Sequence, residues 1–292
     1  MSEKDVILEV RNLSVHFDIP TGGLFGGHKV LKAVKEVSFD LHAGETLGIV
    51  GESGCGKSTL SRAIIRLIQA SGGESKWLGK DILKMSPKEL VALRKDIQMI
   101  FQDPLASLNP RMTAGAIIAE PLLIHYPDVN KAERTARVAE MMQKVGLSPS
   151  MINKYPHEFS GGQCQRIGIA RALITKPKLI VCDEAVSALD VSVQAQVINL
   201  LMDLQKEFGV SLLFIAHDIA VVRHIAQRIM VLYFGEVVEI GDSEQVVMEP
   251  RHDYTKKLIA SVPVPDPKEE MKRREERRRL RREAAAAAAA AA

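Results

Sequence analysis

The segment "GIVGESGCGKSTL", which begins at Gly48, is the feature that most constrains the fold of this chain. Gly51, Gly56, Lys57 and Ser58 match the spacing G-x-x-x-x-G-K-[ST], with a short apolar strand pattern before it and a helical pattern after it. Glycines adopt backbone conformations closed to other residues, so the N–H groups of such a loop can turn inward around an anion at a helix N-terminus.

This spacing therefore predicts a phosphate-binding loop. Lys57 would bridge the terminal phosphates of a nucleotide, and the Ser58 hydroxyl would bind Mg²⁺. A glycine-rich turn without a ligand is the alternative interpretation. The ATP-binding residues predicted from this segment are Gly51, Ser53, Gly54, Cys55, Gly56, Lys57, Ser58 and Thr59.

Strand and helix patterns alternate around the loop. "VILEVRNLSVHF", "VKEVSFDLHAGE" and "TLGIV" are strand patterns within residues 6–50, and "TGGLFGGHK" is a surface-loop pattern between the first two. Further along, "KLIVCDE" and "VSLLFIAHD" are buried-strand runs separated by an amphipathic helix that ends at Gly209. The helix predicted from Lys57 has an apolar face made of Leu60, Ile64, Leu67 and Ile68. This alternation predicts a parallel α/β sheet with sites at the carboxyl ends of its strands.

Residues 104–177 lack strand patterns and contain "NKAERTARVAEMMQKVGL", whose apolar residues have helical spacing and whose glycine is a stop signal. The sequence therefore predicts an inserted helical subdomain. Mixed charges and an alanine run fill residues 268–292, a segment for which we predict no function.

Composition narrows the class of protein. Of 39 basic and 36 acidic residues, nine and five lie between Lys268 and Glu283, which leaves a nearly neutral body and no electrostatic footprint for nucleic acid. The widely spaced Cys55, Cys164 and Cys182 argue against a disulfide framework or a zinc module. The apolar runs are far shorter than the roughly 20 residues of a membrane-spanning helix, and the N-terminus has no signal-peptide pattern. We therefore expect a cytosolic chain whose membrane role would require partner subunits.

Two adjacent carboxylates, Asp183 and Glu184, end the strand pattern "KLIVCDE". In a phosphate-loop protein the first would reach the metal through water, and the second would polarise the attacking water. Acidic turns are common, so this pair predicts catalysis only in combination with the loop.

The segment "FSGGQCQRIGIARAL" resembles the signature segment of ABC-transporter nucleotide-binding domains. The resemblance implies a phosphate-loop NTPase (RecA-like) core with an N-terminal antiparallel β subdomain. It also implies that the segment binds the γ-phosphate of ATP held by an opposite subunit. The residues implied to bind ATP in trans are Ser160, Gly161, Gly162, Gln163 and Asp190, the last from the D-loop match "SALD".

Other matches to this family occur in the family's order. Gln102 in "MIFQDP" matches the Q-loop, and His217 in "LLFIAHD" matches the switch histidine. The resemblance thus implies Glu184, His217 and Gln102 as catalytic residues, and Ser58, Gln102 and Asp183 around the metal. An aromatic residue of the first strand usually stacks on adenine in this family, and we assign Phe17 to that role, with Phe25 as the alternative.

"LASLNPRMTAG", "SALDVSVQAQV" and "PRHDYTKKLIASVPVPDP" resemble the ATPase subunits of oligopeptide and dipeptide importers, from about Val6 to Pro267. The implied domain is 1–267, with a core at about 1–103 and 177–235, a helical subdomain at about 104–176 and a C-terminal segment at about 236–267. One departure is "DEA" where the family commonly has "DEP", and we expect activity to survive because Asp183 and Glu184 remain.

The resemblance implies ATP-driven uptake of oligopeptides or dipeptides, with ATP and Mg²⁺ bound at the cytoplasmic face of the inner membrane. The implied partners are two transmembrane permease subunits, a second related ATP-binding subunit that forms a heterodimer rather than a homodimer, and an extracytoplasmic solute-binding protein. Nickel and other small solutes are the alternative transported substrates. A soluble ABC ATPase acting on ribosomes or DNA and a phosphate-loop kinase are the competing hypotheses, although the neutral body and "SGGQ" disfavour them respectively.

Overall fold

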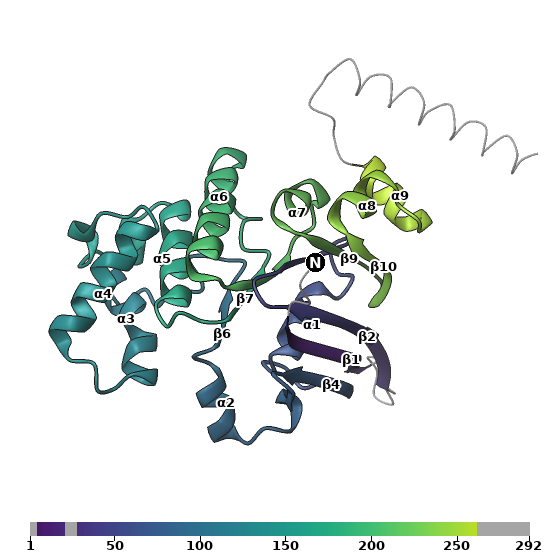
Figure 1. Cartoon of the computed structure of the whole chain (residues 1–292), viewed down its shortest axis with the longest axis horizontal. Helices are drawn as coiled ribbons and strands as arrows, with labels where there is room; N and C mark the ends of the chain where they lie inside the picture. Colours follow the sequence, from purple (N-terminus) through teal and green to yellow (C-terminus); the bar gives the residue numbers. More distant parts are fainter. Residues whose placement is uncertain (1–4, 21–27, 262–292) are drawn as a thin grey trace, which may run out of the picture.

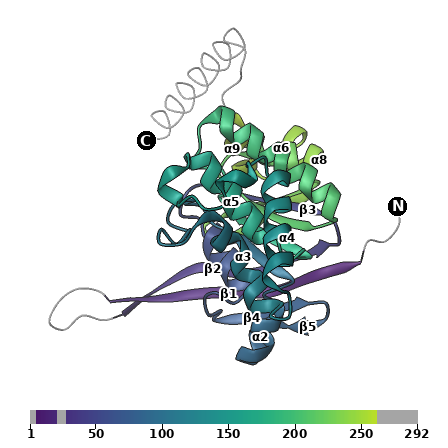
Figure 2. The same cartoon turned by 90° about the vertical axis from the view of Figure 1, so that its left-hand side faces the viewer.

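The structure, a computed structural model, describes residues 5–20 and 28–261. An antiparallel sheet with the strand order β2-β1-β4-β5 forms the N-terminal part. Its strands are β1 (Val6–Pro20), β2 (His28–His42), β4 (Gly72–Trp77) and β5 (Lys80–Asp81). Figure 2 shows β1 and β2 as the two long strands of this sheet. The predicted antiparallel β subdomain is therefore confirmed.

A second sheet has six strands in the order β10-β9-β3-β8-β7-β6. Its strands are β3 (Thr46–Val50), β6 (Ile97–Ile100), β7 (Leu179–Asp183), β8 (Ser211–Ile215), β9 (Arg228–Tyr233) and β10 (Glu236–Asp242). The pairs from β9 to β6 are parallel, and only β10 joins the edge in the antiparallel direction. This arrangement confirms the α/β prediction and adds an antiparallel edge strand that the sequence patterns did not predict.

The helices fall into separate groups around the second sheet (Figure 1). They are α1 (Lys57–Ile64), α2 (Pro87–Leu93), α3 (Ala114–His125), α4 (Lys131–Lys144), α5 (Gly161–Leu173), α6 (Val191–Phe208), α7 (Ile219–Ile225), α8 (Ser243–Met248) and α9 (Asp253–Ala260). Short 3₁₀ turns cover Ile82–Lys84, Pro149–Met151 and Pro156–Glu158. The helices α3, α4 and α5 pack on one another at one end of the molecule, which confirms an inserted helical subdomain.

Both faces of the parallel sheet are buried, and β8 shows how. Leu212 and Phe214 point into a core shared with α3, α5 and α6, whereas Leu213 and Ile215 point into a second core shared with α1 and the antiparallel sheet. Side chains alternate across a strand, so a strand that is covered on both faces needs an unbroken apolar run. This is why "SLLFI" is continuous rather than alternating.

Local signals fix where several helices begin and end. The N–H of Gln163 donates to Ser160 Oγ and the N–H of Ser160 donates to Gln163 Oε1, a reciprocal cap that starts α5. Gly209 adopts the left-handed conformation, with φ of 65°, and ends α6 as predicted. The same cap type, Ser86 with Glu89, starts α2, a helix that the sequence analysis did not predict.

The predicted end of the first helix was wrong, and the sequence analysis missed two strands near it. The α1 helix ends at Ile64 instead of continuing through Ile68, because Arg66 has a φ of 54° that no right-handed helix accommodates. Leu67 is consequently 47% exposed rather than part of the buried face. The strands β4 and β6 were also not predicted, and β6 is only four residues long.

Candidate functional site

Residues 51–59 connect the buried strand β3 to α1 through a tight loop. A Cβ atom on Gly51 would lie 2.2 Å from the carbonyl oxygen of Leu232, and one on Gly56 would lie 2.3 Å from that of Ala33. Gly56 also has a φ of 107°. A side chain at either position would collide with the neighbouring backbone, and the φ of Gly56 also disfavours any other residue. The fold of the loop itself therefore requires glycine at both positions.

Lys57 lies inside this loop and is only 3% exposed. Its Nζ donates to the carbonyl oxygens of Gly51, at 2.8 Å, and Glu52, at 2.9 Å. Burial raises the pKa of the nearby Cys55 thiol, whose Sγ is 3.9 Å from Nζ. The loop therefore holds one cation at its centre, at the N-terminus of α1, where an anion is favoured.

The remaining predicted loop residues surround this cation. Ser53 and Gly54 are exposed, whereas Ser58 and Thr59 on the first turn of α1 are half-buried. The backbone N–H groups and hydroxyls at such a helix start are the donors that phosphate groups require.

At the carboxyl end of β7, Asp183 is fully buried. Its Oδ2 accepts a hydrogen bond from Arg62 Nη2 at 3.0 Å, whereas its Oδ1 is buried without a hydrogen-bond partner among the described residues. A buried carboxylate oxygen of this kind is costly unless a cation or a water compensates for it. The unsatisfied Oδ1 therefore fits a divalent cation bound through oxygen ligands.

Glu184 follows directly and connects the two sides of the site. Its Oε1 lies 3.8 Å from Lys57 Nζ, and its Oε2 accepts a hydrogen bond from Gln102 Nε2 at 2.9 Å. Its backbone φ is 49°, a strained value for a non-glycine residue, and it is held by a 2.9 Å hydrogen bond from Ser187 Oγ to its carbonyl oxygen.

The strand order explains why these side chains meet. The strands β3, β8, β7 and β6 are neighbours and parallel, so the residues after them share one edge. Residues 51–59, His217, Glu184 and Gln102 follow those four strands in that order. His217 is exposed, and no hydrogen bond joins it to another described residue. The structure thus brings Lys57, Glu184 and Gln102 into contact and leaves His217 beside them.

The segment Ser160–Gln163 lies apart from this cluster. No hydrogen bond or ion pair within residues 5–20 and 28–261 joins it to the loop 51–59. Ser160 and Gly161 are exposed, and Asp190 at the start of α6 is also exposed. A Cβ on Gly162 would lie 2.5 Å from Val193 Cγ1, so this glycine is needed for the packing of α5 against α6.

Phe17 on β1 is 42% exposed, and among the described residues no side-chain hydrogen bond or ring contact joins it to the loop 51–59. Phe25, the alternative aromatic residue, lies outside the described residues.

Two contacts of this site involve residues that the sequence analysis missed. Arg62 pairs with Asp183, as described above, and Tyr254 Oη accepts a hydrogen bond from the N–H of Glu52 at 3.0 Å. Glu52 and Tyr254 are 202 positions apart. No local pattern marks either side chain, since each contact depends on how distant elements pack.

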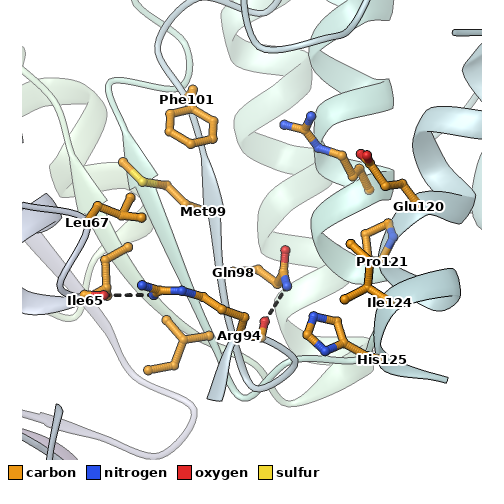
Figure 3. A pocket seen from close by; sticks show the side chains of 12 residues that line it. Ile65, Leu67, Arg94, Gln98, Met99, Phe101, Glu120, Pro121, Ile124 and His125 are labelled. Atoms are coloured by element: carbon orange, nitrogen blue, oxygen red, sulfur yellow. Dashed lines mark hydrogen bonds between the residues drawn. The ribbon is translucent and has the colours of Figure 1, made fainter. Parts of the chain in front are cut away.

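A groove of about 290 Å³ lies between β6, the edge strand of the parallel sheet, and the inserted helix α3 (Figure 3). Figure 3 shows Ile65, Leu67 and Arg94 on one side of it and Glu120, Pro121 and Ile124 on the other. Arg94 donates to the carbonyl oxygen of Ile65 at 2.8 Å, and Arg171 donates to that of Ser107 at 2.7 Å. Burial lowers the pKa of both guanidinium groups from the usual value, although arginine stays charged at neutral pH. The groove therefore combines apolar walls with the guanidinium groups of Arg94 and Arg171 and the carboxylate of Glu120.

Among the described residues, we find no helix with the length and apolar character needed to cross a bilayer.

Comparison with known proteins gives a consistent result. Residues 34–187 match the family model described as ABC transporter, and residues 238–288 match the model of the oligopeptide/dipeptide transporter C-terminal region. The second match extends from the segment after β9 into the range 268–292, for which the sequence predicted no function.

Two curated relatives are the oligopeptide transport ATP-binding proteins OppF of Haemophilus influenzae and Escherichia coli. The first is 62% identical over 271 residues, which cover 92% of this chain and 82% of the relative. The second is 60% identical over 269 residues, with coverages of 91% and 80%. A solved structure, the dimeric post-hydrolysis state of the ATP-binding cassette MJ0796 bound to ADP and Pi, matches with a TM-score of 0.72. It is 30% identical and covers 81% of this chain and 99% of its own.

Proposed function

This chain belongs to the family of ABC transporter ATP-binding subunits, and from that premise we propose that it powers the import of oligopeptides. The contact of Lys57, Glu184 and Gln102 at one edge of the sheet is the observation that carries the proposal. Identity of 60% and more to oligopeptide transport proteins supports peptide as the cargo. These relatives also argue against the hypothesis of an ATPase that acts on ribosomes or DNA.

The phosphate loop binds the triphosphate of ATP. The N–H of Glu52 is bonded to Tyr254, so other N–H groups at the helix start would donate to the phosphates. Lys57, already fixed by the carbonyl oxygens of Gly51 and Glu52, would place its charge among the β- and γ-phosphate oxygens. Ser53, Gly54, Cys55, Gly56, Ser58 and Thr59 complete the loop. Phe17 supplies a ring for adenine.

Glu184 acts as the base that polarises the attacking water. Gln102 holds Glu184 Oε2, so a movement of the segment after β6 changes the position of the base. His217, exposed at the neighbouring strand end, reaches the γ-phosphate and the water. The strained backbone of Glu184 keeps its carboxylate aimed at this position.

Mg²⁺ fits the oxygen donors of Ser58, Gln102 and Asp183, and the unsatisfied Oδ1 of Asp183 is the structural support for it. When bound, the ion neutralises charge on the β- and γ-phosphate oxygens. Arg62, on α1, holds Asp183 in place through their 3.0 Å ion pair.

A second, related ATP-binding subunit completes each site. Support comes from the exposure of Ser160, Gly161 and Asp190, and from the lack of any hydrogen bond or ion pair, among the described residues, between this segment and the loop of its own chain. Head-to-tail pairing would place them over the ATP of the partner subunit. The dimeric state of the solved cassette bound to ADP and Pi supports this arrangement. We propose a heterodimer, as the resemblance implies for this branch.

The groove of Figure 3 receives a short cytoplasmic helix from a permease subunit. Its apolar walls match the apolar face of such a helix, and Arg94 and Arg171 match acidic side chains or a helix C-terminus. The assembly then contains two transmembrane permease subunits and an extracytoplasmic solute-binding protein, with this chain bound at the cytoplasmic face of the inner membrane. ATP-driven closure of the two ATP-binding subunits would move the permeases between two states.

Co-purification after detergent extraction tests this proposal. The tagged full chain is expected to recover two permease subunits and a related ATP-binding subunit, and to restore uptake of labelled peptides in cells that lack it. Ile124→Glu, at a groove residue that is 60% exposed, should abolish both the recovery of the permease subunits and the uptake of labelled peptides. Met248→Glu, at an equally exposed residue of α8 outside the groove, should not. Recovery of ribosomes or nucleic acid alone would refute transport.

A further inference from the structure

The hydrogen bond from Glu52 to Tyr254 joins the phosphate loop to α9, within the part of the chain that matches the oligopeptide/dipeptide C-terminal region. Tyr254 is 8% exposed, whereas Glu52 and the two residues after it are exposed. The exposed part of the loop is thus hydrogen-bonded, through Glu52, to the buried side chain of Tyr254 from a distant segment.

This bond acts on a peptide unit that also contacts Lys57. The N–H of Glu52 and the C=O of Gly51 belong to the same peptide group, and in a trans peptide they point in opposite directions. Tyr254 Oη holds the N–H at 3.0 Å, and Lys57 Nζ holds the C=O at 2.8 Å. Fixing the N–H on one side therefore fixes the carbonyl that receives the lysine on the other.

Tyr254 is itself held in place. Its ring packs on that of Tyr233 with centroids 4.1 Å apart, and its backbone N–H donates to His252 Nδ1 at 3.1 Å. The carboxylate of Glu239 on β10 accepts hydrogen bonds from the N–H groups of Arg251 and His252, both at 3.0 Å. The phenol hydroxyl is thus presented to the loop from a rigid support.

We propose that Tyr254 is a positioning residue of the ATP site, through which the C-terminal segment sets the affinity of the phosphate loop for nucleotide. It does so by holding the Gly51–Glu52 peptide in the orientation that keeps Lys57 at the centre of the loop. Without the hydroxyl, nucleotide binding must also order this peptide, and that ordering weakens binding. The inference rests on the proposed role of residues 51–59 as the ATP site.

Tyr254→Phe tests the inference because it removes the hydroxyl and keeps the ring. Titration of the full chain with Mg·AMP-PNP should show a Kd raised by about two- to tenfold, the size expected for one hydrogen bond. The melting temperature without nucleotide should match that of the control variant below. In the assembled transporter, KM for ATP should rise while kcat changes little, a split that a purely structural role would not produce.

Tyr233→Phe is the matched control. It alters the same ring pair, but the Tyr233 hydroxyl has no hydrogen-bond partner among the residues that the structure describes, so Kd should be unchanged. Equal Kd values for the two variants, or tighter binding by Tyr254→Phe, would overturn the inference about Tyr254 and leave the proposed ATP site unaffected. Lys57→Ala should lose nucleotide affinity. Unchanged affinity in that variant would overturn the proposed site, and the inference with it.

Discussion

The phosphate loop and the first turn of α5 both place glycines at a helix N-terminus, but they differ in what they contact. In the loop, Lys57 contacts two loop carbonyls and Glu184, and Glu184 accepts a hydrogen bond from Gln102. At α5, the side chains of Ser160 and Gln163 cap only their own helix and lie outside this network.

This difference matches the proposed site, in which one chain supplies the loop and a second chain supplies the segment that starts α5. The contacts of Lys57 are made within the chain itself, which reduces the ordering cost of binding. The reciprocal cap satisfies the N–H groups of Ser160 and Gln163 at the start of α5, and Ser160 and Gly161 remain exposed. Variants at the loop side should therefore change catalysis or metal binding, whereas variants at the start of α5 should change stability or the turnover of the assembled transporter.

The largest expected effect is that of Glu184→Gln at the loop side. The amide still accepts a hydrogen bond from Gln102 but takes no proton, so ATP turnover should fall by about 10²- to 10⁴-fold while ATP binding is retained. Phosphate release and nucleotide titration measure the two properties separately. Glu249→Gln, an exposed glutamate beyond α8, is the control. Robust hydrolysis by Glu184→Gln would remove this residue from the role of base.

Asp183→Asn should separate metal binding from phosphate binding in the same region. Loss of the buried charge is expected to weaken Mg²⁺ binding to the ATP complex by roughly ten- to hundredfold, as for other groups that support a metal. Affinity for ATP in the presence of EDTA should be unchanged. An equal loss with and without Mg²⁺ would instead mean that Asp183 acts through its ion pair with Arg62.

At the α5 side, neighbouring glycines should respond differently to alanine. In Gly162→Ala the new Cβ overlaps Val193, so the melting temperature should fall, with a cost of about 1–3 kcal/mol. In Gly161→Ala the nearest atom, Leu189 Cδ2, is 3.9 Å away, so the isolated subunit should keep its stability. Turnover of the assembled transporter should nevertheless fall, because in the proposed dimer the methyl group would face the partner's nucleotide. Normal turnover by this variant would contradict the assignment in trans.

The smallest effect concerns the support of Tyr254. Burial opposes the charged form of Glu239, but hydrogen bonds from the N–H groups of Arg251 and His252 hold the pKa of its carboxyl below the usual 4.5. A lowered pKa means that this stabilisation is complete above about pH 4.5 and disappears as the pH falls through the folded-state pKa.

Glu239→Gln should therefore lower the free energy of unfolding by roughly 1 kcal/mol at neutral pH. Urea denaturation at a series of pH values should show the difference from the unchanged chain shrinking below pH 4.5. A difference that does not change with pH would mean that the charge of Glu239 contributes nothing.

The parts of the fold that follow local signals were predicted correctly. The strand before the loop, the start of α1 at Lys57, and the end of α6 at Gly209 all appear where the sequence places them. The end of α1 was wrong because apolar spacing continues to Ile68 although the backbone turns at Arg66. The four-residue strand β6, which positions Gln102, is too short for an alternation pattern to identify.

The sequence by itself determined the phosphate loop and the helix caps, because glycine sterics, helix caps and motif spacing act over a few residues. Only the tertiary structure decided which side chains meet. Gln102 reaches Glu184 because β6 and β7 are neighbours in the sheet, and Tyr254 reaches the loop because β9 and β10 carry α9 back to it. Burial of apolar faces drives that assembly without encoding any particular pair, so such contacts leave no local pattern to find.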